Sequence, residues 1–497
     1  MTALDHATGA ADAVASPARP PWWVALLDLA IAITCVLLIS AIVWGGPRVR
    51  FADVRITATS VWKLGGVTLL LLALRHALYR RAPSTLAVAG RWWRVVTRDA
   101  GVRRALPWVV TTRLTVLLAT YVAVLVIGYP AERPPFRVAA SEAGNLLARW
   151  DAGWYLGIAE EGYNYWGNAN HQTNVAFFPA YPLTMRAAGS LIGARWGSPE
   201  DPTDTFERFT ERRHVRMLMA GWLVSIAGLV VGLAYLFRLA RDLTDSDEAA
   251  GRAVLLAATY PFAFFFGAVY TEAFFLACAV AACYHFRHRQ WGWAALAGLL
   301  AGLARPNGCL LSVALGVMAL EHWRTDRYRW STLTTGLAVA SCAGLGMLTY
   351  TAWLYGLTGE WFVWMKAHGA WGRQFSGLHV LLAQRWDHLW SLGLYGYSVA
   401  YTIELFNMAA TVLVLALSWP VGRRLGWSYA VWLLVTVVPP LFMGGFLSMG
   451  RVTTTLFPIF IYLGARLTPA AMPHVLLVTF GLQVALAVMH FTWRQVY

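Results

Sequence analysis

The chain has 497 residues, of which 58% are hydrophobic and only 13% are charged, so it is too apolar for a water-soluble protein and is typical of a polytopic membrane protein. Its formal net charge is +15, but the arginines concentrate in short loops between apolar runs, which argues against nucleic-acid binding. The five cysteines lie within or at the ends of apolar runs, so no disulfide framework or metal cluster is expected.

Apolar runs that are long enough to cross a bilayer recur along the whole chain. Counting runs of about 17 to 25 residues predicts an all-α polytopic integral membrane protein with about 13 transmembrane helices. The first apolar run begins only near Trp22 and is long enough to span by itself, so it is expected to be a retained helix. The spans are expected near residues 23–45, 59–78, 107–128, 215–237, 251–269, 272–286, 291–305, 308–322, 331–355, 397–419, 427–447, 452–467 and 473–492.

The distribution of arginine predicts the orientation of these spans. If the spans alternate, the short arginine-rich loops all fall on one side, which should be cytoplasmic. Residues 1–105 are then an N-terminal two-span module with a basic cytoplasmic loop, and residues 106–497 form the main transmembrane core. A large loop, residues 129–214, follows the third span on the extracytoplasmic face. The basic residues that carry this prediction are Arg80, Arg81, Arg91, Arg94, Arg98, Arg103, Arg104, Arg287, Arg289, Arg324, Arg327, Arg329, Arg423 and Arg424.

The same orientation places the unusual polar and aromatic motifs on the outer face. Nucleotide sugars are not available there in quantity, so an activated donor would have to arrive in the membrane, and a lipid-phosphate-linked group fits that requirement. The motifs are RWDAGWYLGIAEEGY at 149–163, AFFPAYPL at 176–183, VYTEAF at 269–274, ARPNG at 304–308 and SMGRV at 448–452.

The motifs RWDAGWYLGIAEEGY, AFFPAYPL, YPFAFFFGAVYTEAFF and GLARPNG resemble, in this order, the second mannosyltransferase of GPI-anchor synthesis and its bacterial relatives (PIG-V-like). That family belongs to the GT-C superfamily of polyprenyl-phosphate-sugar-dependent glycosyltransferases. The resemblance covers roughly residues 107–467. It implies a GT-C-like fold, a polyprenyl-phosphate-mannose donor and an acidic catalytic base near the start of the first large external loop, which here is Asp151. In the family that loop usually follows the first span rather than the third, so the first 105 residues are an addition.

Asp151 also fits the role of base on chemical grounds. A sugar hydroxyl is a poor nucleophile until its proton is being removed, so a carboxylate within hydrogen-bond reach is needed. The alternative is a helix-capping aspartate, because a short helix could open at this residue.

Aromatic side chains near Asp151 are candidates for an acceptor or lipid groove. Tryptophan and tyrosine also form ordinary interfacial belts in membrane proteins, and the two prolines of AFFPAYPL favour a kinked entry into a surface helix. Both structural alternatives remain open for these residues. The candidates are Trp150, Trp154, Tyr155, Phe177, Phe178 and Tyr181.

Three arginines are candidates for holding the phosphate of the donor, since a guanidinium can stabilise a departing phosphate in place of a general acid. They are Arg305, Arg451 and Arg149; snorkelling to lipid headgroups is the alternative for the first two. Glu272 could orient the acceptor or a metal, or simply favour a helix start, and Asn307 of the ARPNG motif is a further candidate for the acceptor or lipid groove. Glu404, inside an apolar run, is costly unless paired and could meet one of these arginines.

Three other motifs are set aside. The DSD motif at 245–247 imitates a metal-binding acidic motif but lies in a short cytoplasmic loop, and Asp387 in QRWDHLW lacks the aromatic and proline residues that follow Asp151. The histidines of the long loop, His368, His379 and His388, lack zinc-ligand spacing. No metal site and no cofactor are therefore expected, although a divalent metal is a minor alternative.

The sequence and this resemblance predict an inverting α-mannosyltransferase on the outer side of a bacterial plasma membrane. Mannose is implied by the resemblance alone, and a different pentose or hexose donor remains an alternative. Its partners would be membrane lipids, the lipid-linked donor and a glycolipid, lipoglycan or protein acceptor; the oligomeric state is not predicted. A lipid-linked-sugar flippase is the competing class, but transporters tend to place ionisable residues near the bilayer midplane. A scaffold for other envelope enzymes would need neither Asp151 nor buried charge.

Overall fold

The computed structural model of the chain describes residues 21–44, 48–51, 54–57, 60–79, 98–165, 167, 171–194, 205–373, 375 and 377–496. The chain divides into two compact units between Val96 and Thr97, nine residues before the expected boundary at 105. The segment 80–97, which holds four of the arginines used to orient the spans, lies outside the described residues.

The first unit contains two apolar helices, α1 (Trp22–Trp44) and α2 (Val61–Leu78). Arg75 of α2 pairs with Asp28 of α1 at 3.0 Å. The strands β1 (Arg48–Phe51) and β2 (Val54–Thr57) form an antiparallel pair between the helices in sequence. The all-helical prediction missed this pair, although RVRF and VRIT contain the alternating β-branched and aromatic residues that favour strands.

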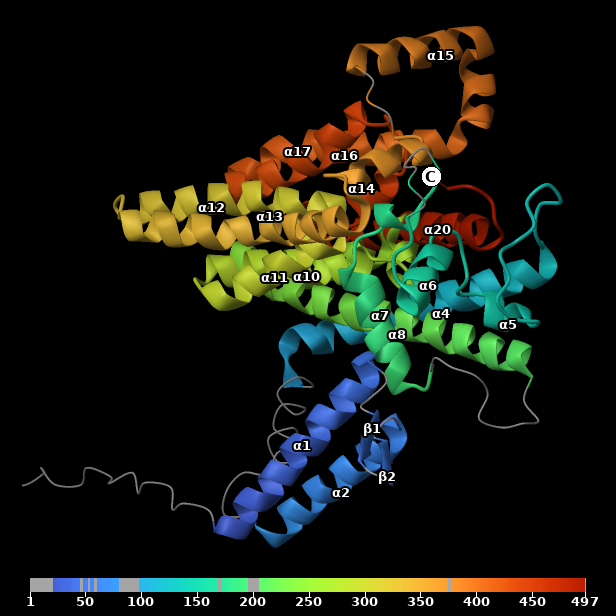
Figure 1. Cartoon of the computed structure of the whole chain (residues 1–497). Helices are drawn as coiled ribbons and strands as arrows, with labels where there is room; N and C mark the ends of the chain where they lie inside the picture. The colour runs from blue at the N-terminus through green and yellow to red at the C-terminus, as the bar shows by residue number, and fades with distance from the viewer. Residues whose placement is uncertain are drawn as a thin grey trace, which may run out of the picture. The chain divides into compact units, whose positions relative to one another are not determined.

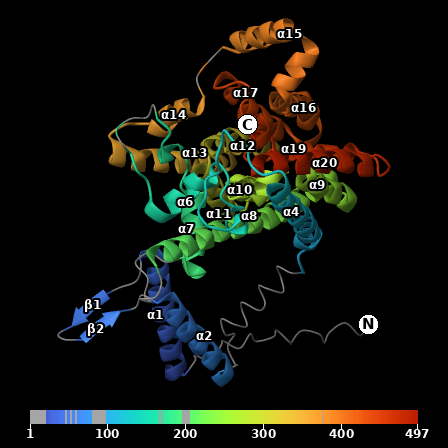
Figure 2. The same cartoon turned by 90° about the vertical axis from the view of Figure 1, so that its right-hand side faces the viewer.

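The second unit is helical in its described part, and Figures 1 and 2 show α8 and α10 to α13 running side by side. Long apolar segments form helices here because a helix satisfies every backbone hydrogen bond within a bilayer. Its elements are α4 (Ala100–Val126), α5 (Glu142–Asn145), α6 (Ala152–Glu161), η1 (Asn174–Ala176), α7 (Ala180–Leu191), α8 (Phe206–Thr244), α9 (Asp247–Thr259), η2 (Ala263–Gly267), α10 (Glu272–Arg287), α11 (Trp291–Ala304), η3 (Pro306–Leu310), α12 (Leu311–Thr325), α13 (Trp330–Thr358), α14 (Val363–Ala367), η4 (His368–Trp371), α15 (Leu378–Ala400), α16 (Thr402–Leu425), α17 (Trp427–Phe442), α18 (Met449–Thr453), α19 (Phe457–Arg466) and α20 (Met472–Phe491).

Six of the described helices are long and apolar enough to cross a membrane: α2, α4, α8, α13, α16 and α20. The chain is therefore a multi-pass membrane protein. The expected span at 251–269 is instead divided into α9 and the short helix η2, because the chain leaves the helical conformation at Tyr260 and Pro261. With 39 residues, α8 is about 58 Å long and exceeds the roughly 30 Å of a bilayer core, so one of its ends projects from the membrane.

Glycines allow close packing in the helix bundle. A side chain at Gly302 of α11 would clash with the carbonyl of Ala343 on α13, and one at Gly346 of α13 would clash with the carbonyl of Leu299 on α11. Small residues let helix backbones approach each other in this way in membrane proteins. This packing fixes the end of α11, where one of the candidate arginines lies.

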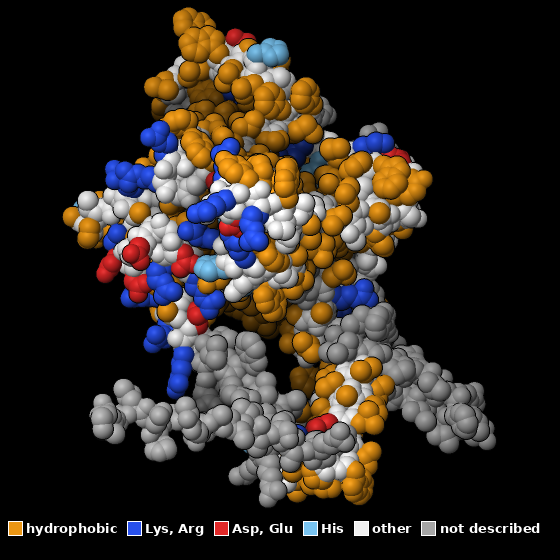
Figure 3. All heavy atoms as spheres, turned by 90° about the vertical axis from the view of Figure 1, so that its left-hand side faces the viewer, with side chains coloured by type: hydrophobic (Ala, Val, Ile, Leu, Met, Phe, Trp, Pro, Cys, Tyr) orange, Lys and Arg blue, Asp and Glu red, His pale blue; other side chains and the backbone are white. Residues whose placement is uncertain are grey.

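Short basic turns gather at one end of this unit. Arg289, after α10, forms two bonds with Asp326, after α12, at 2.7 and 2.6 Å, which brings these turns together. The backbone N–H of Ser428 donates to Glu321 of α12 at 3.1 Å, so the turn between α16 and α17 lies at the same end. Figure 3 faces the side on which α12 turns into α13 and shows basic side chains interspersed with acidic ones. Glu272 begins α10, and Arg305 directly follows α11. Because α10 and α11 run antiparallel, both residues lie at the end of the helices opposite to the basic turns.

Candidate active site

Asp151 lies where the chain turns into α6. Trp150, directly before it, has a φ of 50°, a left-handed conformation that is uncommon for a bulky residue. The backbone carbonyl of Asp151 accepts bonds from Trp154 and Tyr155, but its carboxylate caps no helical N–H. The capping alternative is therefore wrong. Instead, Oδ2 accepts a hydrogen bond from Nη1 of Arg451 at 2.6 Å.

The second carboxylate oxygen of Asp151 is available for chemistry. Oδ1 has no hydrogen-bond partner among the described residues, and it is not one of the buried atoms without a partner. The Asp151 side chain is 14% exposed. The carboxylate thus has one oxygen fixed by an ion pair and one oxygen open to a ligand.

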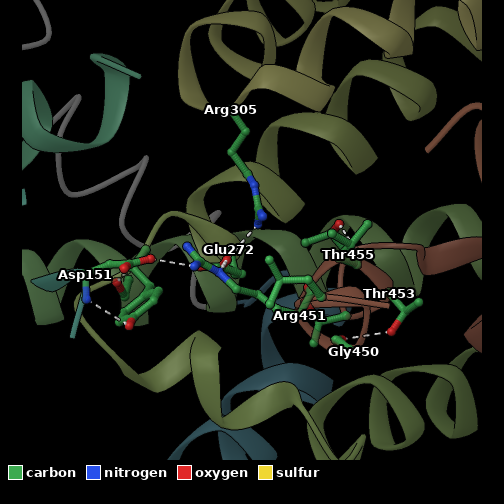
Figure 4. A network of polar contacts seen from close by, with 12 residues as sticks. Asp151, Glu272, Arg305, Gly450, Arg451, Thr453 and Thr455 are labelled. Atoms are coloured by element: carbon green, nitrogen blue, oxygen red, sulfur yellow. Dashed lines mark hydrogen bonds and ion pairs between the residues drawn. The ribbon is translucent and has the colours of Figure 1, made fainter. Parts of the chain in front are cut away.

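Glu272 links two arginines at the start of α10 (Figure 4). Its Oε1 accepts from Nη1 of Arg305 at 2.8 Å and also from Nε of Arg451. The Glu272 side chain is fully buried, and those of the two arginines are 11% and 15% exposed. These arginines therefore form an interior ion-pair network and do not snorkel to lipid headgroups.

Tyr270 contacts both Asp151 and Arg451. The backbone N–H of Asp151 donates to the Tyr270 hydroxyl at 3.2 Å, and the guanidinium of Arg451 lies 4.6 Å from the ring centroid. Such a contact between a cation and an aromatic face is attractive. Asp151, Tyr270, Glu272, Arg305 and Arg451 come from four segments that are distant in the sequence, and the fold brings all of them together.

The turn that carries Arg451 is fixed by its backbone. Ser448 has a φ of 58°, and the N–H of Gly450 donates to the side chain of Asn407 on α16 at 2.6 Å. The hydroxyl of Thr453 bonds that of Tyr260 at 2.9 Å. Arg451 is thus anchored to α16 and to the end of α9, so its guanidinium has a defined direction.

Arg373 is a further cation near the network that no sequence motif indicated. It follows η4 and is partly buried, and the one hydrogen bond described for its guanidinium is to the carbonyl of Leu447 at 3.4 Å. Burial, together with the positive charges of Arg451 and Arg305, lowers the pKa of Arg373 to about 10, so it remains charged at neutral pH. Three arginines therefore face two carboxylates, which leaves one positive charge uncompensated.

Aromatic rings cluster around the first turn of α6, which follows Asp151. Trp154 stacks on Phe177 with centroids 5.8 Å apart, and both rings meet the edge of Trp371 at 5.4 Å. Tyr155 contacts Phe177 edge-to-face at 5.2 Å, and burial raises its pKa to about 12, so its hydroxyl stays protonated. Trp154 and Phe177 are half-buried and could contact a ligand. Trp371 joins them from η4 and was missed by the sequence prediction.

Besides Tyr155 and Glu272, which are buried, two further predicted groove residues, Phe178 and Tyr181, lie in the interior. Phe178 is 1% exposed and packs against Tyr350 and Trp364. Tyr181 is fully buried, and its hydroxyl donates to the carbonyl of Gly221 at 2.9 Å. We therefore exclude both from a ligand groove. Asn307 is half-buried, and its Nδ2 has no partner among the described residues.

Arg149 and Trp150 brace the loop against α20. Arg149 is 1% exposed, and its guanidinium donates to the carbonyls of Phe491, at 2.8 Å, and Asn145. Trp150 donates from Nε1 to the carbonyl of His490 at 3.0 Å. The donors of Arg149 are directed at backbone carbonyls and at the hydroxyl of Tyr129, which lies 3.0 Å away, so the structure gives it a positioning role in place of the predicted contact with donor phosphate.

The remaining charged candidates lie apart from the network. Glu404 pairs with Arg385 of α15, not with Arg305 or Arg451. Asp387 is exposed on α15. In the DSD motif, Ser246 caps α9 by accepting from the N–H of Ala249 at 3.2 Å, which is a structural use of the turn. Across the described ranges, no three acidic, histidine or cysteine side chains are grouped as metal ligands.

Comparisons with known proteins give a family and a similar solved structure. Residues 96–491 match the family described as Mannosyltransferase (PIG-V). Among solved structures, the chain is similar to the crystal structure of ArnT from Cupriavidus metallidurans bound to undecaprenyl phosphate, with 13% sequence identity and a TM-score of 0.42. That similarity covers 77% of this chain and 64% of ArnT, so it spans less than two thirds of that protein. A comparison with curated proteins gives no match.

Proposed function

The chain belongs to the PIG-V mannosyltransferase family, and on this premise we propose that it is an inverting, GT-C-type α-mannosyltransferase. It transfers mannose from a polyprenyl-phosphate-mannose donor to a hydroxyl of a glycolipid, lipoglycan or protein. The observation that carries the proposal is the position of Asp151, with one oxygen fixed by Arg451 and the other open.

In the proposed reaction, Oδ1 of Asp151 accepts the proton of the acceptor hydroxyl as its oxygen bonds to the anomeric carbon. The bond between that carbon and the phosphate oxygen breaks, and its electron pair leaves with the phosphate. In-line attack on a β-linked donor gives an α-linked product. General-base assistance of this kind typically contributes about 10²- to 10⁴-fold in rate.

The departing phosphate needs positive charge. Arg305 and Arg451 are both bonded to Glu272, whereas no ion pair involves Arg373 in the described part of the chain. Arg373 is therefore the strongest candidate for holding the phosphate, with Arg451 and Arg305 beside it. Guanidinium groups stabilise phosphate without a divalent ion, so we propose that transfer needs no metal.

The site is proposed to face the extracytoplasmic side of a bacterial plasma membrane. The short basic turns that include Arg289 and Arg424 resist translocation, and the network lies at the opposite end of the helices. The shorter apolar helices α11, α17 and α19 have 14, 16 and 10 residues, fewer than the roughly 17 that a straight span needs, so the count of about 13 spans stays a prediction. A lipid-linked donor suits this face because it arrives within the membrane.

The proposal is tested with purified protein in detergent, synthetic polyprenyl-phosphate-mannose and extracts of membrane glycolipids, with the Asp151→Asn variant as the matched control. We expect transfer of labelled mannose by the parent only, both with and without EDTA. Loss of transfer in EDTA that Mg²⁺ restores would overturn the metal-independent mechanism. Movement of the donor across liposomes without any transfer would favour the flippase, although the charged network at one end of the helices argues against it.

A further inference from the structure

Helix α15 (Leu378–Ala400) presents large apolar side chains to its surroundings along its whole length. Only Leu381 and Tyr397 are buried, whereas the side chains of Trp390 and Tyr395 are 81% and 83% exposed. Both views in Figures 1 and 2 show α15 standing away from the remaining helices of its unit. Apolar surface of this extent is not left in contact with water in a stable protein.

Gly393 divides α15 into two arms. Its φ of 68° and ψ of 169° lie in a region that is nearly restricted to glycine. The helix therefore bends, so that residues 378–392 and 394–400 run in different directions. Exposed apolar side chains occur on both arms, at Leu382, Trp386 and Trp390 on the first and at Leu394, Tyr395 and Val399 on the second.

The second arm leads directly into a membrane span. Only Tyr401 separates α15 from α16 (Thr402–Leu425), which is long and apolar enough to cross a bilayer. Near the start of α16, Asn407 accepts a bond from the N–H of Gly450, the neighbour of Arg451. The start of α16 thus lies at the level of the charged network, which places α15 at the same level.

Two polar residues of the first arm contact residues at the start of α16, whereas Asp387 is exposed. Arg385 pairs with Glu404, and the ring of His388 stacks on that of Tyr401 with centroids 5.3 Å apart. Helix α15 has exposed tryptophan and tyrosine side chains and a few charged groups. This composition is typical of helices that lie at the boundary between headgroups and acyl chains.

We propose that α15 is a membrane-embedded element whose two apolar arms contact the lipid of the leaflet that borders the charged network. The occupant of its exposed surface is bilayer lipid, not water and not another protein. This inference depends on the membrane spans and on the geometry of α15, and it holds whether or not Asp151 is a catalytic base.

The test is spin labelling of the full chain in lipid nanodiscs, in a background without native cysteines. Single cysteines at Leu382, Trp390 and Leu394 carry a nitroxide, and its collisions with oxygen, which partitions into lipid, are compared with its collisions with a water-soluble nickel complex. Leu348 on the α13 span is the lipid control, and Glu207 at the exposed start of α8 is the water control.

We expect the ratio of oxygen to nickel accessibility at all three positions to match that at Leu348 and to be severalfold higher than that at Glu207. Ratios like that at Glu207 would place α15 in water. Low accessibility to both reagents with an immobilised spectrum would show a covering protein. Either result would overturn the proposal without affecting the proposed reaction, which the transfer assay tests separately.

Discussion

Arg451 donates to Asp151 at 2.6 Å while also bonding the fully buried Glu272. The proposed base is therefore held by the same guanidinium that lies next to the proposed phosphate site. A phosphate that binds there competes with Asp151 for Arg451, so binding of the donor and release of the base are coupled. This relationship gives opposite expectations for binding and for turnover when the charge of Asp151 is removed.

Asp151→Asn should abolish most transfer but preserve donor binding. We expect the turnover rate to fall by about 10²- to 10⁴-fold, and the dissociation constant for polyprenyl phosphate to stay the same or decrease, because Arg451 loses its competing carboxylate. Turnover and binding are measured in one detergent. Asp387→Asn, on exposed α15, is the control and should change neither; turnover of the Asp151 variant within a few-fold of the parent would remove Asp151 as the base.

Arg373→Ala should weaken the donor interaction. Hydrogen bonds to charged groups contribute about 1.5 to 3 kcal/mol, or roughly ten- to a hundredfold in binding, and we expect the KM for the donor to rise by that factor. Arg373→Lys should restore part of the affinity because it keeps the charge. Arg289→Ala, at the opposite end of the helices, is the matched control. An unchanged KM in Arg373→Ala would show that the uncompensated charge is not used for phosphate.

Glu272→Gln should destabilise the protein. Removing the charge of Glu272 from a fully buried ion-pair network leaves Arg305 without its acidic partner and Arg451 with Asp151 alone, and such a loss costs about 3 to 5 kcal/mol. The thermal midpoint in detergent should fall clearly. Glu404→Gln removes the partly exposed partner of Arg385, and such pairs contribute about 0 to 1 kcal/mol. Equal midpoints for the two variants would show that the Glu272 network does not support the fold.

Topology can be tested with single cysteines at exposed residues whose backbone tolerates a side chain. Glu161 at the end of α6 and Arg424 at the end of α16 meet this requirement, whereas Gly167 and Gly426 have a positive φ. In cells, an impermeant thiol reagent should label Glu161→Cys from outside and Arg424→Cys only after permeabilisation. The reverse pattern would place the charged network on the cytoplasmic face.

His368 should make the protein acid-sensitive. Burial lowers its pKa from 6.5 to about 4, and its Nδ1 bonds the carbonyl of Trp364 at 2.7 Å. The unfolded chain therefore binds a proton more readily than the folded chain, so His368 contributes stability above pH 6.5 that is lost as the pH falls from about 6.5 to 4. Thermal midpoints across this range should decline less in His368→Asn than in the parent or in His379→Gln, which alters an exposed histidine. Parallel declines in all three proteins would contradict this role.

Sequence patterns were sufficient to identify the charged residues at one end of the helices. Asp151, Glu272, Arg305 and Arg451 were named from their motifs, and the fold brings them into one network. Hydrophobic runs also anticipated most helices of the second unit. These predictions succeed because a bilayer imposes length and polarity on each span, and charged residues near span ends are therefore conspicuous.

The direction of individual side chains could not be predicted in the same way. Arg149 adjoins Asp151 in the sequence, yet its guanidinium donates to the carbonyl of Phe491. Arg373 lies in a long loop without a recognisable motif, and only the packing of η4 near Leu447 brings it close to Arg451. The depth of a residue in the membrane can be estimated from the sequence, whereas the partner of each side chain depends on tertiary contacts.

The contacts between the loop that carries Asp151 and α20 have a consequence for biosynthesis. Trp150 bonds His490, 340 residues later in the chain, and Arg149 bonds Phe491. The ribosome therefore produces the loop with Asp151 long before the helix that holds it in place. A nascent chain that ends before α20 contains every charged residue of the network but lacks these two backbone acceptors, so the protein should become active only after α20 has been inserted.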